Sequence, residues 1–379
     1  MNQLTLDPST GPRSTQEGPT GIVLLNLGGP KNLDEVGPFL LGLFQDREII
    51  QLPFQKWLGP FIAKRRTPKV QRLYEGIGGG SPILDWTNVQ GQGMVDRLDR
   101  LSPETAPHTF YVAFRYIDPF SEDALKQMKA DGVKRAIAFT QYQHFSCATT
   151  GSSLNELWRA AGRLRMANEF QWSVIDRWPT HPSFIRAMVK TVQDGLGQFR
   201  EDEQDDVLLM FSAHSLPLSI IDRGDPYPQE VGASVHEVLK AGGFKNQFVL
   251  CYQSEVGPVP WLGPSTEHVI RELGAKGRKR ILVVGIAFTS DHIETLSEID
   301  IEYAHLARSV GITEFRRAPA FNGEPLFQDA LAEIVLDHLR SGEACSSQYG
   351  LRCPGCTNPQ CRDILNPAGH HIRTPLTVG

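Results

Sequence analysis

The sequence of 379 residues predicts an α/β fold made of two similar units, each with a four-stranded parallel sheet covered by helices on both faces. Three observations support this class. Short, nearly continuous apolar runs alternate with longer amphipathic stretches of helical length. The runs are rich in β-branched and aromatic residues, as buried strands are. They also fall into two sets of four, and the chain is long enough for two domains.

The expected strands and domain limits follow from these runs. In the first unit we expect strands at residues 22–27, 110–114, 135–139 and 172–175. In the second unit we expect strands at residues 207–211, 247–251, 280–288 and 314–317, with a closing helix at 324–339. The resulting division is a flexible tail (1–20), a first domain (21–182), a second domain (183–340) and a polar, Cys-rich C-terminal extension (341–379).

Composition excludes several classes of protein. Lys and Arg number 38 against 43 Asp and Glu, so the net charge of −5 gives no basic face for nucleic acid. No stretch approaches 18 uninterrupted apolar residues, which argues against a membrane span. Six cysteines are too few for a disulfide scaffold. Residues 1–20 are not amphipathic or Arg-rich, as a mitochondrial transit peptide would be.

An unusually apolar segment, residues 38–62, follows the first expected strand and is followed almost at once by Lys64, Arg65 and Arg66. We expect Pro53 and Pro60 to break it into short helices. One interpretation is a pair of core helices. The other is an exposed apolar lip, suited to a lipid surface or to a large flat ligand.

A glycine-rich segment, GIGGGSP at residues 76–82, does not match the dinucleotide fingerprint. Ser81 takes the place of the last glycine, and an amphipathic stretch precedes the segment where a strand is required. Glycines still allow backbone N–H groups to approach an anion. A carboxylate held by Arg66, Tyr74 and Ser81 fits as well as a phosphate, and a plain turn is the alternative.

His214, in FSAHSLP, comes at the end of an expected parallel strand, where α/β sheets bind ligands. An imidazole there can accept a proton near neutral pH. Ser212 and Ser215 flank it, but a hydrolase is rejected because the chain has no G-x-S-x-G elbow.

A row of carboxylates follows the expected strand at 280–288. Glu294, Glu298 and Glu302 recur every four residues on a predicted helix, with Asp291 and His292 at its start. A solvated acidic face is one interpretation. The other is a path for protons or divalent cations, which carboxylates and imidazole both suit.

Three cysteines near the C-terminus, Cys353, Cys356 and Cys361, lie within nine residues. Zinc or iron–sulfur ligation needs a fourth ligand, for which Cys345, Cys251 and Cys147 are candidates.

Taken together, these segments resemble the ferrochelatase family over residues 21–365, closest to its animal and fungal type. The motifs that carry the resemblance include LLNLGGP, GPFIAKRRTPK, IGGGSPI, FRYIDP, FSAHSLP, RGDPYPQEV, VGPVPWLGP and AFTSDHIETLSEID. The resemblance implies two Rossmann-like domains in a chelatase-like fold. It also implies a lyase that inserts ferrous iron into protoporphyrin IX with release of two protons, the terminal step of haem biosynthesis.

The resemblance also implies roles for individual residues. His214 would accept the pyrrole protons, and Glu294 would support it, with His292, Glu298 and Glu302 continuing the path. Arg115 and Tyr116 would lie on the opposite pocket face, on an iron-delivery side. The apolar positions around the macrocycle would be Leu27, Tyr142, Trp261 and Phe288, and the propionate contacts would be Arg66, Tyr74 and Ser81. His181 and Glu333 match positions with weaker acid–base assignments. Leu27 departs from the Met of animal enzymes, which puts a thioether contact to the metal in doubt.

The same resemblance implies a [2Fe–2S] cluster, one per chain, held by Cys147, Cys353, Cys356 and Cys361. It implies a homodimer bound peripherally to the matrix side of the mitochondrial inner membrane; the alternative is a bacterial cytoplasm or the inner face of the plasma membrane. A nicotinamide-dependent oxidoreductase is the first competing hypothesis, and the failed fingerprint disfavours it. A porphyrin carrier or iron–sulfur electron-transfer protein is the second, and it would not need His214 opposite a carboxylate row.

Overall fold

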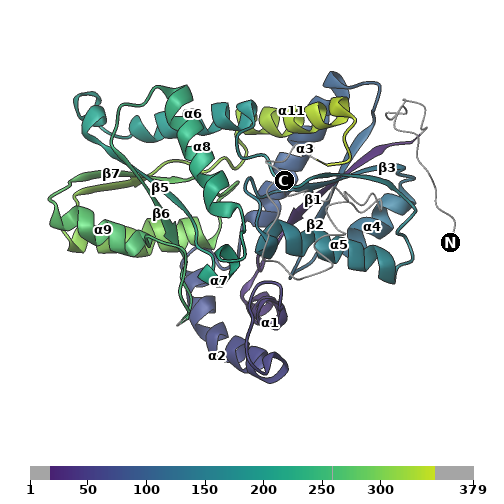
Figure 1. The fold of residues 1–379 in the computed structure, drawn as a ribbon, viewed down its shortest axis with the longest axis horizontal. Coiled ribbons are helices and arrows are strands. Elements are labelled where there is room, and N and C mark those ends of the chain that lie inside the picture. Colours follow the sequence, from purple (N-terminus) through teal and green to yellow (C-terminus); the bar gives the residue numbers. More distant parts are fainter. Residues whose placement is uncertain (1–17, 258, 346–379) are drawn as a thin grey trace, which may run out of the picture.

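The computed structural model describes residues 18–257 and 259–345 and confirms the predicted fold class. Two four-stranded sheets have parallel strands in equivalent orders, β2-β1-β3-β4 and β6-β5-β7-β8 (Figure 1). The first sheet contains β1 (Thr20–Asn26), β2 (His108–Phe114), β3 (Arg135–Thr140) and β4 (Gln171–Ile175). The second contains β5 (Leu208–His214), β6 (Phe248–Gln253), β7 (Arg280–Gly285) and β8 (Glu314–Arg317).

Helices connect the strands in both halves. In the first half these are η1 (Leu33–Glu35), α1 (Val36–Gln45), α2 (Gln55–Glu75), α3 (Ile83–Leu101), α4 (Ser121–Ala130), η2 (Cys147–Gly151) and α5 (Ser152–Arg163). In the rest of the chain they are α6 (Pro182–Leu196), η3 (Glu201–Asp206), α7 (Leu218–Ile221), α8 (Tyr227–Gly242), α9 (Thr266–Ala275), η4 (Glu294–Tyr303), α10 (Ala304–Ser309) and α11 (Pro325–Ser341).

All eight expected strands are present, with shifted ends. β1 begins at Thr20, inside the expected tail, and β5 continues to His214, so the imidazole stands on the last residue of a strand. The expected strand at 280–288 was too long, because β7 stops at Gly285. Its ladder with β5 ends at the pair Ser212–Gly285, and the chain then turns toward η4. Phe288 therefore lies in a turn, with its N–H directed at Gly285.

One hydrophobic core joins the two halves. Helix α11, at the end of the second half, packs against α3 of the first half and against α6 (Figure 1). The largest buried cluster accordingly includes Ile22 and Leu24 of β1 as well as Leu209 and Phe211 of β5. The strand ends of the two sheets are thus held at fixed positions relative to each other.

The apolar segment forms a lip, helices α1 and α2 with their connecting loop, that projects from the body of the molecule (Figure 1). The expectation that Pro60 breaks this segment is wrong, since Pro60 and Pro68 both lie inside α2. A proline removes one hydrogen bond from a helix, and the packing of α2 along α1 keeps the helix intact here. No helix among the described residues is long and apolar enough to cross a membrane.

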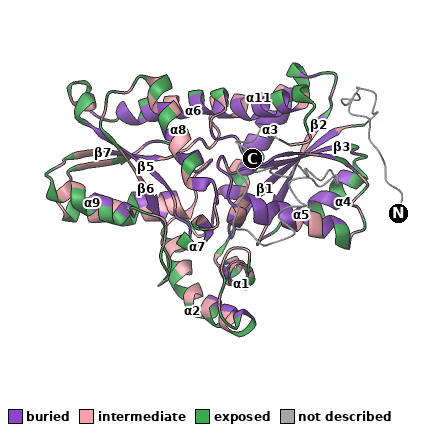
Figure 2. Ribbon diagram, viewed as in Figure 1, coloured by how far each residue is buried: buried purple, intermediate pink, exposed green. Residues whose placement is uncertain are grey.

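The lip combines the two interpretations of its sequence. Leu40 and Phe44 of α1 are buried in a small core of their own. Phe54, Trp57 and Phe61 instead expose 85%, 80% and 60% of their surface, and Figure 2 shows this end of the lip largely exposed.

Candidate active site

His214 and Glu294 form the centre of the candidate site. The Nδ1 atom of His214, at the end of β5, lies 3.0 Å from Oε2 of Glu294, at the start of η4. The Nε2 atom of His292 lies 3.5 Å from the same carboxylate oxygen. The Nδ1 atom of His292 is 2.9 Å from the carbonyl oxygen of Ser290, which fixes its ring. The structure therefore brings together three of the expected residues around one oxygen atom.

The charges of His214, Glu294 and His292 shift the pKa values of His214 and Glu294. Burial disfavours a charged imidazole, but the Glu294 carboxylate outweighs that effect, so the pKa of His214 lies above its ordinary value. Burial alone would raise the pKa of Glu294. The hydrogen bonds and charges of His214 and His292 hold it well below the usual range instead. Glu294 is thus an anion next to a base that is strengthened by it.

The carboxylate row lies on a π-helix, not on the ordinary helix that the sequence predicts. In this form each backbone N–H pairs with the carbonyl five residues earlier, and such turns are frequent at functional sites. Glu294 and Glu298 face different partners on the wider turn, His214 and Ser254 respectively. Glu302 is exposed, and its pKa is raised by burial of its stem and by the charge of Glu298.

Residues of the first half surround the same carboxylate. Burial raises the pKa values of the Tyr74 and Tyr142 hydroxyls, and the charge of Glu294 adds to the shift in both. The hydroxyl oxygen of Tyr142 accepts the backbone N–H of Leu27 at 2.6 Å, just after β1. The structure thus brings Leu27 and Tyr142 together just beyond the carboxyl ends of β1 and β3.

Two further apolar positions lie in loops of the second half. The Phe288 ring packs edge-on against His292, with centroids 4.7 Å apart. Trp261 donates its indole N–H to the carbonyl of Val256 at 3.1 Å and pairs with Pro217, in the segment that follows His214. Both side chains are half-buried, so each keeps a face available to a ligand.

Two of the residues expected to bind a carboxylate, Arg66 and Ser81, have different surroundings in the structure. The Arg66 guanidinium stacks over the Phe44 ring at 5.7 Å, and burial lowers its pKa. Within residues 18–257 and 259–345 it has no ion-pair partner. Ser81 is buried and packs against Gly29, where an added Cβ would lie 2.7 Å from its hydroxyl oxygen. The segments LLNLGGP and IGGGSPI therefore pack against each other.

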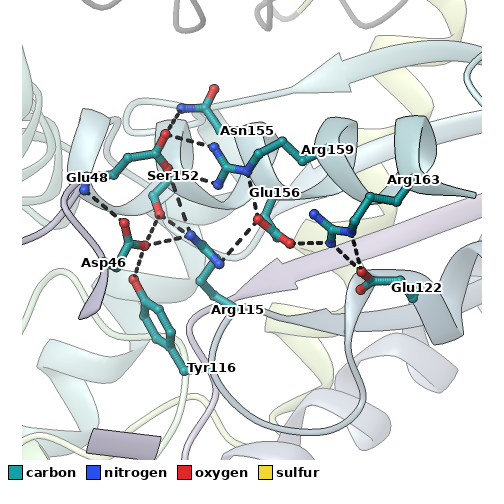
Figure 3. Close-up of polar contacts among 10 residues, drawn as sticks. All are labelled: Asp46, Glu48, Arg115, Tyr116, Glu122, Ser152, Asn155, Glu156, Arg159 and Arg163. Atoms are coloured by element: carbon teal, nitrogen blue, oxygen red, sulfur yellow. Dashed lines mark hydrogen bonds and ion pairs between the residues drawn. The ribbon is translucent and has the colours of Figure 1, made fainter. Parts of the chain in front are cut away.

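Arg115 and Tyr116 point to the lip (Figure 3). The Arg115 guanidinium and the Tyr116 hydroxyl both donate to Oδ2 of Asp46, each at 2.6 Å. Arg115 also lies 3.4 Å from Glu156 and donates to Ser152 at 3.2 Å. Both side chains thus connect the loop after α1 to β2 and α5.

The contacts continue along α5 as an ion-pair network. Arg159 lies 3.0 Å from Glu48 of the lip loop and 2.9 Å from Glu156 of its own helix. The lip loop is therefore held at two carboxylates, Asp46 by Arg115 and Glu48 by Arg159. The members of the network are Asp46, Glu48, Arg115, Tyr116, Glu122, Ser152, Asn155, Glu156, Arg159 and Arg163 (Figure 3).

His181 and Glu333 lie in a different place, between α6 and α11. The Nε2 atom of His181 is 3.2 Å from Asp337, and burial lowers the pKa of His181. Glu333 accepts hydrogen bonds from Arg186 at 2.6 Å and from Ser183. No described contact links this pair to His214 or Glu294.

Of the four expected cluster ligands only Cys147 falls within the described residues, since Cys353, Cys356 and Cys361 lie outside them. Cys147 is half-buried at the start of η2, and its backbone N–H donates to Asp225 at 2.8 Å. At the end of the described chain, Val174 of β4 donates its N–H to Ala344 at 2.9 Å and pairs with Cys345. The C-terminal extension therefore begins beside β4, the edge strand of the first sheet. Cys147 lies in the segment that follows β3 of the same sheet.

Comparison with known proteins decides the family. The ferrochelatase family model matches residues 19–339. The chain is 55% identical over 343 residues to a mitochondrial ferrochelatase of Xenopus laevis, covering 90% of this chain and 84% of the relative. The identity is 53% over 345 residues to the Homo sapiens enzyme, covering 91% and 82% of the two chains. It is 49% over 351 residues to the Schizosaccharomyces pombe enzyme, covering 92% and 83%.

The chain belongs to the ferrochelatase family. Ferrochelatases are metal-inserting lyases of the terminal step of haem biosynthesis, so the predicted family and activity are both confirmed. The fold is also shared with the structure titled SirB from Bacillus subtilis with Fe3+, at a TM-score of 0.50 and 11% identity, covering 86% of this chain and 98% of that chain. At that identity the likeness concerns the fold alone.

Several residues of this ferrochelatase site were not singled out from the sequence. Gln253, at the end of β6, contacts both Glu294 and Glu298. Tyr227, in the RGDPYPQEV motif, donates its hydroxyl to the carbonyl of His214 at 2.9 Å. Asp46 accepts hydrogen bonds from both Arg115 and Tyr116. A signal existed for Gln253 alone, which is a polar residue ending an apolar strand at the same sheet edge as His214.

Proposed function

We propose that this chain inserts ferrous iron into protoporphyrin IX with His214 as the base that removes the pyrrole protons. The observation that carries the proposal is the 3.0 Å contact between His214 Nδ1 and Glu294 Oε2 at the carboxyl end of β5. Metal insertion releases two protons, so it needs a base within reach of the ring nitrogens. The His214 side chain is 37% exposed, which leaves its other edge accessible to a ligand.

The contact defines which nitrogen acts. A carboxylate accepts hydrogen bonds, so Glu294 favours the tautomer with the proton on Nδ1 of His214. The lone pair of Nε2 is then available for a pyrrole N–H. When His214 takes that proton it becomes an imidazolium, which the Glu294 anion stabilises.

His292 offers a second place for a proton. Its Nε2 atom faces the same Glu294 oxygen, and the contact becomes an ion pair when His292 is protonated. The two imidazoles around one carboxylate match the two protons that leave the porphyrin. The exposed Glu302 marks the end of the row that meets solvent.

The porphyrin site follows from the surrounding side chains. A flat apolar ring with acidic substituents needs apolar walls and cationic or N–H anchors at one edge. Leu27 and Phe288 would supply walls from opposite halves of the chain. Arg66, a half-buried cation of α2, would bind a propionate together with Tyr74 and Ser81, both of which are buried. Iron delivery from the side of Arg115 and Tyr116 is part of the same proposal.

The lip supports peripheral binding to a membrane. Phe54, Trp57 and Phe61 are exposed on a segment that also carries Lys64 and Arg65, a combination suited to the interface of an anionic bilayer. The mitochondrial inner membrane is the proposed location because the curated relatives are named mitochondrial. The homodimer expected from the family belongs to the same proposal, and light scattering of the purified protein tests it.

A [2Fe–2S] cluster is proposed at Cys147, Cys353, Cys356 and Cys361. The described residues fit it in two respects: the Cys147 side chain is half-buried at the start of η2, and the extension starts on β4 of the sheet whose strand β3 precedes Cys147. From Cys345 the eight residues to Cys353 span at most about 28 Å. When bound, such a cluster supplies a covalent link between the extension and the first domain, since thiolate ligation contributes folding free energy.

Anaerobic incubation with ferrous iron and protoporphyrin IX, followed by the absorbance of metalloporphyrin, tests the activity. Turnover by the purified chain supports the proposal. Tight porphyrin binding without any product would instead favour a porphyrin carrier.

A further inference from the structure

We infer that Gln253 is a positioning residue that holds Glu294 at its working distance from His214. The inference rests on the proposed function, because it concerns the same base and carboxylate. Gln253 is 1% exposed and ends β6. In the parallel register it stands opposite His214, and its carbonyl accepts the N–H of Ser215 at 2.8 Å. Its backbone is thus fixed to the strand that carries the base.

The side chain of Gln253 links this strand pair to the π-helix. Its Oε1 atom accepts the Ser212 hydroxyl at 2.7 Å, two residues before His214. Its Nε2 atom donates to the backbone carbonyl of Glu294 at 3.1 Å and to Oε2 of Glu298 at 2.9 Å. Both N–H groups and the oxygen of the amide are therefore used. One buried side chain joins the strand of the base to the first turn of the helix that carries the carboxylate.

Glu298 completes this link instead of standing ready to accept a proton. Its carboxylate accepts four hydrogen bonds: from Gln253, from the backbone N–H of Ser254 at 2.9 Å, from the Ser254 hydroxyl at 2.5 Å and from Tyr303 at 2.8 Å. An ionised carboxylate has about four acceptor positions, so these donors occupy them. Protonation would displace at least one donor. We therefore assign Glu298 to the positioning group, as the anion onto which Gln253 and Ser254 are fixed.

The consequence is geometric. Without the Gln253 amide, the Glu294 backbone and the Glu298 carboxylate lose their shared donor, and η4 is free to shift from the end of β5. Displacement of a catalytic group by about 1 Å can lower a rate about 10²-fold. We expect the loss in kcat and not in porphyrin binding, since no proposed porphyrin contact is removed. The pKa of His214 should fall toward its ordinary value as Glu294 moves away.

Two variants test the assignment. Gln253→Leu removes the whole amide, and Gln253→Glu keeps the oxygen for Ser212 while removing the donor to Glu294 and Glu298. The matched control is Asn246→Leu, because Asn246 also donates its amide to two backbone carbonyls, of Gln204 and Val207, at the opposite end of β5. All three are measured for kcat, for porphyrin KM and for the His214 titration by NMR of 15N-labelled imidazole.

The expected result is a fall in kcat of about 10²-fold in both Gln253 variants, with KM within about threefold. The pKa of His214 should be lowered in Gln253→Leu, which adds no charge beside the imidazole. Asn246→Leu should keep kcat within about twofold, as a distant site should. Wild-type kcat and an unshifted His214 titration in folded Gln253→Leu would overturn the inference, and so would wild-type kcat in folded Gln253→Glu. If wild-type protein makes no metalloporphyrin, the proposed function fails, and the His214 titration alone still decides whether Gln253 positions the pair.

Discussion

The imidazole of His214 and the carboxylate of Glu294 are 80 residues apart in the chain and 3.0 Å apart in the fold. The pair forms because β5 and β7 are neighbours in the second sheet, so the segments that leave their carboxyl ends meet. Apolar residues of β1 and β3 share the largest buried cluster with β5, so the two sheets have a common core. An imidazole whose pKa is raised by a neighbouring carboxylate suits the proposed removal of pyrrole protons.

Replacing Glu294 by Gln should move the pH dependence of the reaction. The Glu294 charge raises the pKa of His214, and His214 must be neutral to accept a pyrrole proton. Activity in the wild type should therefore rise with pH through that elevated pKa. In Glu294→Gln the acidic limb of kcat should lie at lower pH, with a smaller maximum because the imidazolium loses its counter-ion. Glu267→Gln, which breaks an exposed pair with Arg271, is the control and should leave the limb in place. If the acidic limb of kcat is unshifted in Glu294→Gln, Glu294 does not set the pKa of the base.

Serine at the exposed lip positions should weaken membrane binding. Phe54, Trp57 and Phe61 are the side chains to change, whereas Leu40 packs inside the lip. Loss of three large apolar contacts should lower co-sedimentation with anionic vesicles by at least about tenfold. Phe248→Ser is a suitable control, because Phe248 is 54% exposed at the start of β6, outside the lip. If the wild-type protein does not bind vesicles, the membrane role is contradicted and the lip is only an entrance for porphyrin.

Removing the Asp46 carboxylate should destabilise the protein and loosen the lip. Asp46 is 8% exposed at its side chain and is the shared acceptor of Arg115 and Tyr116. Its loss leaves a half-buried guanidinium and a hydroxyl without that partner, which should cost about 1–3 kcal/mol of unfolding free energy. Urea denaturation of Asp46→Ala measures this cost. The exposed pair Lys190–Asp194 provides the comparison, since Asp194→Ala should change stability by less than about 0.5 kcal/mol. Equal stabilities of the two variants would argue against the network as an anchor of the lip.

Cys147→Ser should abolish iron and sulfide binding. Anaerobically purified wild type should contain about two irons and two sulfides per chain, as a [2Fe–2S] cluster requires. The variant should lose both, together with the visible absorbance, and should unfold at a lower temperature because the extension is no longer linked to the first domain. Cys251→Ser, at a buried cysteine of β6, should keep the cluster. One zinc and no sulfide in the wild type would show a structural zinc site instead.

The sheets and the centre of the site could be predicted from the sequence because both depend on local patterns. Apolar runs define buried strands, and the residues that directly follow parallel strands share one edge of a sheet. His214 was located in this way, whereas Leu27 was named only through the family resemblance. The type of helix at Glu294 could not be predicted, since a spacing of four residues suits an α-helix equally well. The partners of the two carboxylates, His214 for Glu294 and Ser254 for Glu298, lie at or just beyond the ends of other strands and are visible only in the fold.

Positioning residues escaped prediction for the same reason. Gln253 carries only a weak signal, as a polar residue at the end of an apolar strand, and Asp46 carries none. The importance of both lies in which distant groups they join. The lip shows the converse limit: its sequence is apolar throughout, and only packing separates the buried Leu40 from the exposed Trp57.

The measurement that tests the central claim most directly is ferrous iron insertion by His214→Ala, with porphyrin binding followed in parallel by fluorescence. Removing the imidazole deletes the proposed base and leaves the apolar walls intact. The rate of metalloporphyrin formation should fall by at least about 10²-fold, the lower range of general-base effects, while the porphyrin Kd stays within about threefold. Wild-type turnover by a folded His214→Ala protein would contradict the assignment of His214 as the base.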